Sequence, residues 1–178
     1  MRNIDDVRQG RRFSCKITLM ITIYTDGSSR GNPGPGGWAA IIMDEARVVE
    51  LGGREDHTTN NRMELMGAIK ALDFAGSLSD SKIELHTDSE YVMKGITLWI
   101  AGWQKRGWRT AAKKPVLNQD LWQKLILVSD GKDIDWKYVA GHSGQEWNDR
   151  CDEIATSFAD DLTISLYNGT RRRYKPGL

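Results

Sequence analysis

Residues 18–43 read TLMITIYTDGSSRGNPGPGGWAAIIM, and this stretch decides the fold class. The run Thr18–Thr25 is rich in β-branched residues, which favours a strand that ends at Asp26. The glycine- and proline-rich stretch that follows predicts a turn-forming loop, and the apolar run Trp38–Met43 predicts a second strand. A third strand is expected over Ala46–Gly52, so the pattern predicts a series of antiparallel hairpins.

The rest of the chain alternates between helical and strand patterns. Leu65, Ile69 and Leu72 repeat at helical spacing, and Thr59 or Asn60 can cap that helix. The remaining elements are expected as strands over Lys82–Thr87 and Asp135–Ala140, short helices through Arg106, a helix over about 119–128 and a last helix from Glu146 to about Asp160. We therefore expect an α/β fold with one five-stranded mixed sheet, three antiparallel strands followed by two parallel ones, flanked by helices.

Four acidic residues stand in separate short motifs: Asp26 in YTDGS, Glu64 in NNRMEL, Asp88 in HTDSEYV and Asp152 in NDRCDE. Only the fold can bring them together, and each close pair of carboxylates costs roughly 4 kcal/mol at an effective dielectric of about 20. Binding of hard divalent cations such as Mg²⁺ justifies that cost. Asp26 and Asp88 are expected at strand ends, where open sheets of this kind bind their ligands.

Each acid also has a simpler interpretation. Asp26 before Gly27 can begin a turn, Asp88 can cap the next helix, and Asp152 can lie on a solvated helix face. Glu64 can be a solvated residue favoured by the helix dipole. These simpler roles account for the motifs only if all four arise independently and in this order.

Composition places the chain among ordinary globular proteins. It has 178 residues, 39% hydrophobic and 28% charged, which fits a single domain. No apolar run approaches the roughly 20 residues of a membrane span. Cys15 and Cys151 suggest neither a disulfide framework nor a zinc site, and Cys151 is expected to be a buried, reduced thiol, so a cytoplasmic protein is expected. We expect a polar, disordered extension over 1–17, one domain over 18–161 and a basic tail over 162–178. The stretch Arg171–Lys175 of this tail is expected to be disordered or loosely docked, either as a solvated terminus or as an auxiliary nucleic-acid contact.

Basic residues are concentrated at three places, although the net charge is only +1. The first nineteen residues carry five bases against two acids, and the tail carries Arg171, Arg172, Arg173 and Lys175. Between Tyr91 and Gln119 there are six bases and no acid. An acidic body with basic attachments suits a polyanion partner held beside an acidic metal site.

The motif order TDGS–GNPGPGGW, TTNNRMEL, TDSEYV, GHSG and NDRCDE, over Ile21 to about Asp161, resembles ribonuclease H of type 1. The resemblance implies a monomeric endonuclease that cleaves the RNA strand of RNA–DNA hybrids and leaves 3′-hydroxyl and 5′-phosphate ends. It implies two Mg²⁺ ions per site, with Mn²⁺ as a possible substitute, flanking the scissile phosphate.

The resemblance also assigns roles residue by residue. Asp26, Glu64, Asp88 and Asp152 correspond to the metal-binding carboxylates, and His142, between Gly141 and Gly144, to a mobile histidine that shuttles a proton or aids product release. The positions matching substrate contacts are Asn32, Asn60 and Asn61 at the RNA 2′-hydroxyls, Thr59 and Asn118 at a DNA phosphate, and Trp103, Trp108, Lys105, Arg106, Lys113 and Lys114 in a basic protrusion over 94–117. Turn, cap and solvated-surface roles remain open for the same residues.

Two features leave alternatives open. Glu90, beside Asp88, is a fifth acid that can weaken substrate binding, shift metal affinity or point away. Trp99 is expected to pack within the protrusion, with Trp103 and Trp108 more open. A catalytically silent hybrid-binding module and a nuclease that cuts DNA are the competing functions; the four acids together disfavour the first and the asparagine-rich motifs disfavour the second.

Overall fold

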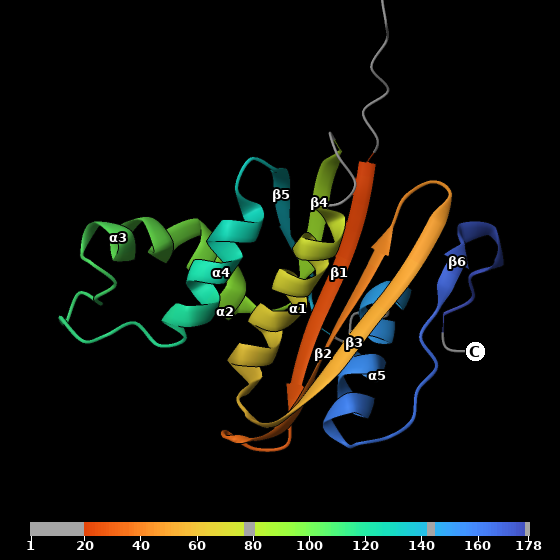
Figure 1. Cartoon of the computed structure of the whole chain (residues 1–178), viewed down its shortest axis with the longest axis horizontal. Helices are drawn as coiled ribbons and strands as arrows, with labels where there is room; N and C mark the ends of the chain where they lie inside the picture. Colours follow the sequence, from red (N-terminus) through yellow and green to blue (C-terminus); the bar gives the residue numbers. More distant parts are fainter. Residues whose placement is uncertain (1–19, 77–80, 142–144, 177–178) are drawn as a thin grey trace, which may run out of the picture.

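The computed structural model describes residues 20–76, 81–141 and 145–176. These residues form one mixed sheet with helices on both of its faces (Figure 1). The elements are β1 (Met20–Ser29), β2 (Gly34–Met43), β3 (Arg47–Thr58), α1 (Asn60–Ala75), β4 (Lys82–Thr87), α2 (Glu90–Lys94), a π-helix (Gly95–Trp99), α3 (Ile100–Lys105), α4 (Gln119–Ser129), β5 (Asp133–Tyr138), α5 (Glu146–Ala159), β6 (Asn168–Thr170) and a 3₁₀ turn (Arg171–Arg173).

The sheet has the strand order β5-β4-β1-β2-β3-β6. β1, β2 and β3 pair antiparallel, and β4 and β5 continue the sheet in parallel from β1. The predicted α/β fold and its strand directions are confirmed. The predicted count of five strands is wrong, because β6 pairs antiparallel with the outer edge of β3 and makes a sixth strand among the described residues.

The basic tail is therefore not loosely docked as expected. Tyr167 and β6 lie against β3, where the Glu50 N–H donates to the Tyr167 carbonyl at 2.7 Å. The sequence Asn168-Gly169-Thr170 is short and polar, so no periodic pattern marks it as a strand. Its conformation depends on the free edge of β3, which is a tertiary effect.

The first two strands run further than predicted. Ser28 and Ser29 pair with Gly37 and Gly36, so only the tip of the glycine-rich stretch forms the turn. Glycine is required at this end of the sheet because the helices come very close: a Cβ on Gly37 would lie 2.2 Å from the Ala155 carbonyl oxygen of α5. Asp26 consequently lies inside β1 rather than at its end.

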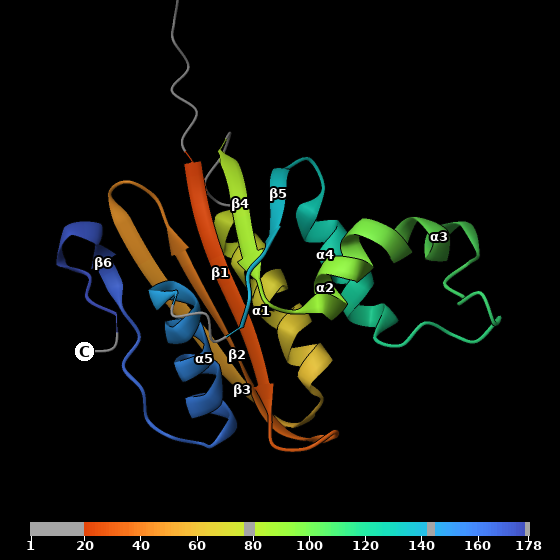
Figure 2. The same cartoon turned by 180° about the vertical axis from the view of Figure 1, so that it is seen from behind.

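Helices cover the two faces of the sheet separately. α1 and α4 pack on one face, and α5 packs on the other, as the opposite views show (Figures 1 and 2). Side chains alternate accordingly along β2: Ala40 and Ile42 join the core under α1, whereas Ala39 and Ile41 join the core under α5. Cys151 is buried in that second core and is free, as expected, while Cys15 lies outside the described residues.

The segment between β4 and α4 extends away from the sheet (Figure 1). It contains the predicted short helices, namely α2, the π-helix and α3. The Trp122 ring packs directly on the backbone of Gly95, where a Cβ would be 1.9 Å from the ring, and this contact ties the start of the segment to α4. No helix in the described part of the chain is long and apolar enough to cross a membrane.

Candidate active site

Asp26 and Asp88 are brought together by the register of two parallel strands. β1 and β4 pair up to Thr25 and Thr87, so Asp26 and Asp88 are the next residues on neighbouring strands. β4 ends at this point, and Ser89 caps α2 by accepting a hydrogen bond from the Val92 N–H. The cap role considered for Asp88 thus falls to Ser89, which leaves the Asp88 carboxylate available.

Glu64 reaches the same place from α1. Thr59 caps this helix by accepting from the Arg62 N–H, so the cap is Thr59 rather than Asn60. The helix lies directly on β1 at Gly27, where a Cβ would be 2.2 Å from the Glu64 nitrogen. A larger residue at position 27 would push the first turns of α1, and with them Glu64, away from Asp26.

The three carboxylates form one compact group. One carboxylate oxygen from each of Asp26, Glu64 and Asp88 lies within 4.8 Å of the other two. Asp26 and Glu64 are each only 6% exposed, and Asp88 is half-buried. The predicted convergence is observed for these three residues.

Burial and mutual repulsion disfavour the ionised forms of this group. Burial, followed by the charge of Asp88, raises the pKa of Asp26 to about 8, and the Gly27 N–H that donates to its Oδ1 only partly opposes this. Burial and the charges of Asp26 and Asp88 likewise raise the pKa of Glu64 well above its ordinary value. Without a cation, the pocket therefore holds protons at neutral pH.

The group fits a divalent cation chemically. Its donors are all carboxylate oxygens, the ligands that Mg²⁺ prefers. Among the described residues, Glu64 Oε2 is buried without a hydrogen-bond partner, so an oxygen already removed from water is free to coordinate. A cation would both satisfy that oxygen and neutralise the repulsion.

Asp152 does not belong to the compact group, although the sequence suggested four converging acids. It lies half-buried on α5, where its Oδ1 accepts from the Thr156 hydroxyl at 3.4 Å. Its charge still contributes to raising the pKa of Asp26, so it lies within electrostatic reach. His142 is outside the described residues.

Asn148 is a site residue that the sequence reasoning did not single out. It is 1% exposed, and its Nδ2 donates to Asp88 Oδ2 at 3.3 Å. The signal was available, because Asn148 stands four residues before Asp152 in NDRCDE and therefore shares its helix face.

The residues expected to contact RNA are exposed, and one of them is hydrogen-bonded to the acidic group. Asn60 Nδ2 donates to Glu64 Oε1 at 3.3 Å, which joins an expected substrate contact to an acid of the site. Asn61 is exposed beside it, and Asn32 is exposed at the turn between β1 and β2.

Thr59 and Asn118 are linked through Arg62. The Arg62 N–H donates to Thr59 Oγ1, and its Nη1 donates to Asn118 Oδ1 at 3.5 Å. Arg62 also forms an ion pair with Asp120 at 2.9 Å. Two residues expected to hold one phosphate are thus both bonded to Arg62, Thr59 to its backbone N–H and Asn118 to its guanidinium group.

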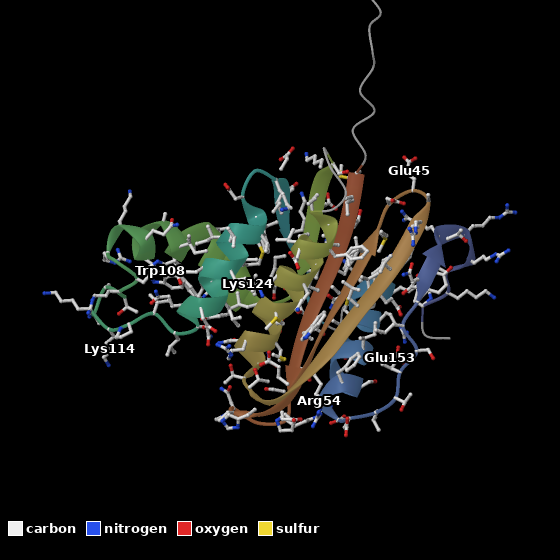
Figure 3. All side chains as sticks on the ribbon, in the orientation of Figure 1. Glu45, Arg54, Trp108, Lys114, Lys124 and Glu153 are labelled. Atoms are coloured by element: carbon white, nitrogen blue, oxygen red, sulfur yellow. The ribbon has the colours of Figure 1, made fainter. Side chains whose placement is uncertain are left out.

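The protrusion has an aromatic interior and a basic surface. Trp103 packs against Trp99, Trp108 and Trp122 with ring centroids 5.6–6.5 Å apart. Trp99, Trp103 and Trp108 are all half-buried, so the expected difference in openness between Trp99 and the other two is not observed. The labelled Lys114 extends from the outer end of this segment (Figure 3). All four bases expected to contact phosphates are exposed, namely Lys105, Arg106, Lys113 and Lys114.

Glu90 points to its own helix. It is exposed and forms an ion pair with Lys94 at 2.6 Å, which lowers its pKa. It is not part of the compact acidic group. Of the three possibilities considered, pairing away from the acids fits these contacts.

Together, the fold and the acidic group define an α/β enzyme with a site suited to a divalent metal. Comparison with known proteins gives the family. The RNase H family model matches residues 19–160. A ribonuclease H from Cyanothece sp. is 54% identical over 138 residues, which cover 77% of this chain and 87% of that protein.

Two solved structures are also similar. LC9-RNase H1, described as a type 1 RNase H with the type 2 active-site motif, has a TM-score of 0.74 and 28% identity, covering 85% of this chain and 78% of that one. LC11-RNase H1 in complex with RNA/DNA hybrid has a TM-score of 0.59 and 25% identity, covering 79% and 97%. The chain belongs to the ribonuclease H family, type 1, and is a nuclease.

Proposed function

We propose that this protein is an endoribonuclease that hydrolyses the RNA strand of RNA–DNA hybrids with Mg²⁺, acts as a monomer in the cytoplasm and leaves 3′-hydroxyl and 5′-phosphate ends. The observation that carries the proposal is the buried group of Asp26, Glu64 and Asp88, with ligand oxygens within 4.8 Å of one another. Support for the substrate comes from LC11-RNase H1, which was solved with an RNA/DNA hybrid.

The proposed roles of the acids follow from their positions. Asp26, Glu64 and Asp88 would hold the cations, and Asp152 would complete the set from α5. The chemistry supplied by two bound Mg²⁺ ions would be activation of the attacking water and stabilisation of the leaving 3′-oxygen. Mn²⁺ offers the same oxygen-based coordination. His142 would move a proton or help release the product.

Recognition of RNA would rest on amide side chains. Asn32, Asn60 and Asn61 can each donate and accept hydrogen bonds, which suits a 2′-hydroxyl. The hydrogen bond from Asn60 to Glu64 supports this role, because it holds an amide that can bind a 2′-hydroxyl next to an acid of the site.

The DNA strand would be bound on the side of the protrusion. Thr59 and Asn118 would hold one phosphate together with Arg62, which lies between them. Lys105, Arg106, Lys113 and Lys114 would contact further phosphates, and Trp103 and Trp108 would present ring surface from the aromatic cluster.

One assay tests the proposal. Labelled hybrid, double-stranded RNA and duplex DNA are incubated with Mg²⁺, then again with EDTA and with the Asp26→Asn variant. We expect cleavage of the RNA strand of the hybrid alone, with 3′-hydroxyl ends, and none with EDTA or the variant. Hybrid binding without cleavage would identify a catalytically silent module, and cleavage of duplex DNA would identify a DNA nuclease.

A further inference from the structure

A second buried charge lies apart from the acidic group. Glu50 on β3 and Arg150 on α5 form a two-pronged ion pair, with Arg150 Nε to Glu50 Oε1 at 2.9 Å and Nη2 to Oε2 at 3.0 Å. The two side chains are 1% and 8% exposed. A buried ion pair offsets the cost of its desolvation only where further hydrogen bonds satisfy the remaining donors and acceptors of both side chains.

The segment after α5 supplies that completion, and we call residues 162–176 the C-terminal strap. The Tyr167 N–H donates to Glu50 Oε2 at 2.8 Å, and the Tyr174 hydroxyl donates to Oε1 at 2.7 Å. The Ser165 carbonyl accepts from Arg150 Nη2 at 3.0 Å. Burial opposes ionisation of Glu50, but the bonds from Arg150, Tyr174 and Tyr167 outweigh it and keep its pKa below the ordinary value.

Aromatic contacts fix the strap to the first turn of α5. The Tyr174 ring stacks on Trp147 with centroids 5.0 Å apart and planes 11° apart. Tyr167 meets Tyr174 edge-on at 5.0 Å. Figure 2 shows the strap turning back beside α5 and rising to β6 at the edge of the sheet.

The same helix carries the residues that reach the acidic group. Asn148 and Asp152 lie two positions before and after Arg150. Asn148 donates to Asp88, and Asp152 acts electrostatically on Asp26. Because α5 is one continuous helix over these residues, a shift or rotation of the helix at Arg150 would move both neighbours with it.

The strap lies beyond the residues that the family model matches. The family match ends at residue 160, and the strap begins at 162. Glu50 and Arg150 therefore lie within the matched region, whereas three of the groups that complete their hydrogen bonding, from Ser165, Tyr167 and Tyr174, lie beyond it.

We propose that the C-terminal strap is a positioning element for the acidic site. The strap completes the hydrogen bonding of the Glu50–Arg150 pair and so holds α5 in place on the sheet. In this position of α5, Asn148 contacts Asp88, and Asp152 is within electrostatic reach of Asp26. Tyr174 is a positioning residue in this arrangement, since its contacts are with Glu50 and with aromatic rings rather than with Asp26, Glu64 or Asp88. The predicted effect of the strap on Mg²⁺ binding concerns the acidic group alone. The predicted effect on kcat also rests on the proposed function.

Two substitutions at one position separate the contributions of the strap. Tyr174→Phe removes the hydroxyl that donates to Glu50 and keeps the ring on Trp147, whereas Tyr174→Ala removes both. Mg²⁺ affinity is measured by calorimetry without substrate, α5 mobility by amide hydrogen exchange, and kcat and KM on hybrid at 25 °C. We expect Tyr174→Ala to weaken Mg²⁺ binding and lower kcat more than twofold, to leave KM within twofold, and to speed exchange in α5; Tyr174→Phe shifts each value in the same direction by less.

A matched control variant shows whether a loss of stability by itself weakens Mg²⁺ binding. Leu125→Ala opens a cavity in α4, within the core on the other face of the sheet, and lowers the melting temperature without touching α5. We expect its Mg²⁺ affinity to stay within twofold of the parent chain. The inference is overturned if Tyr174→Ala keeps Mg²⁺ affinity within twofold, or if Leu125→Ala weakens it as much. Absence of hybrid cleavage by the parent chain would instead refute the proposed function, while the calorimetric comparison would still decide the role of the strap.

Discussion

Asp26 and Glu64 occupy buried positions where a neutral side chain would fold more readily. The surrounding residues only partly relieve their repulsion: hydrogen bonds from the Gly27 N–H and the Asn60 amide lower the two pKa values, and within the described part of the chain no cationic side chain forms an ion pair with either carboxylate. At the scale of single residues, the site therefore lowers stability in return for ligand geometry.

The burial and repulsion of these carboxylates make the stability of the metal-free protein depend on pH. Burial and Asp88 raise the pKa of Asp26 to about 8 from its ordinary 3.8. The folded chain then holds a proton that the unfolded chain has lost, so the stability contributed is complete below about pH 4 and is lost as the pH rises towards 8. In EDTA, we expect Asp26→Asn to melt about 5 °C above the parent chain at pH 8, with a smaller difference at pH 5, measured by calorimetry or circular dichroism.

Asp133→Asn serves as the control for a lost negative charge. Asp133 is exposed at the start of β5, far along the strand from the acids. We expect it to shift the melting temperature equally at both pH values. A difference between Asp26→Asn and the parent chain that does not grow with pH would contradict the raised pKa.

At the scale of elements, sequence patterns predicted best where one local signal sufficed. Lys82–Thr87 alternates buried and half-exposed residues and was predicted to the residue, because period-two patterning is a local property. β6 could not be predicted, since Asn168-Gly169-Thr170 has strand conformation only through pairing with β3. The ends of β1 and β2 are misjudged because Gly36 and Gly37 indicate a turn locally. In the structure, Gly37 admits α5 and Gly36 lies close to the Thr58 side chain and the Ser28 carbonyl oxygen of the neighbouring strands.

The basic residues of the protrusion are expected to make hybrid binding depend on salt concentration. If its bases contact phosphates, each contact releases about one counterion, so the slope of log K against log salt falls by about 0.9 per contact removed. We expect Lys105→Ala with Lys114→Ala to weaken hybrid binding at low salt and reduce the slope by about 1 to 2, with kcat at saturating hybrid unchanged. Fluorescence anisotropy over a salt series in Ca²⁺ or EDTA measures this.

A pair of bases elsewhere provides the comparison. Lys82 and Lys132 stand just where β4 and β5 begin, at the end of the strands opposite Asp88. Replacing both by alanine removes the same charge, and we expect the salt slope to be retained. Equal slopes for the two double variants would show that the basic surface of the protrusion does not bind the hybrid.

At the scale of the whole molecule, the site joins elements that the chain places far apart. The motifs identified Asp26, Glu64 and Asp88, because residue type and order are visible in the sequence. Their partners were less visible: Asn148 approaches Asp88 across 60 positions, and Glu50 meets Arg150 across 100. The helical spacing in NDRCDE places Asn148 on the same face as Asp152, but the partner of each residue depends on how α5 lies on the sheet, which is a tertiary property.

Because β1, α1 and β4 each supply one acid, a bound cation would link three elements and stabilise the entire fold. Ligands that bind only the folded state raise its stability by about 2.7 kcal/mol at a hundred times the dissociation constant, which corresponds to roughly 5–10 °C here. The cation must also displace protons held by Asp26 and Glu64, since only ionised carboxylates coordinate well.

We therefore expect Mg²⁺ to bind more tightly as the pH rises from 6 to 8 and to release the protons held by Asp26 and Glu64 when it binds near pH 7. Calorimetry in two buffers of different ionisation enthalpy measures the number of protons released. Asp26→Asn should lose most of the Mg²⁺-induced rise in melting temperature, and Asp133→Asn should retain all of it. Mg²⁺ binding that is independent of pH, or equally strong in Asp26→Asn, would mean that the ion binds somewhere other than the buried carboxylates.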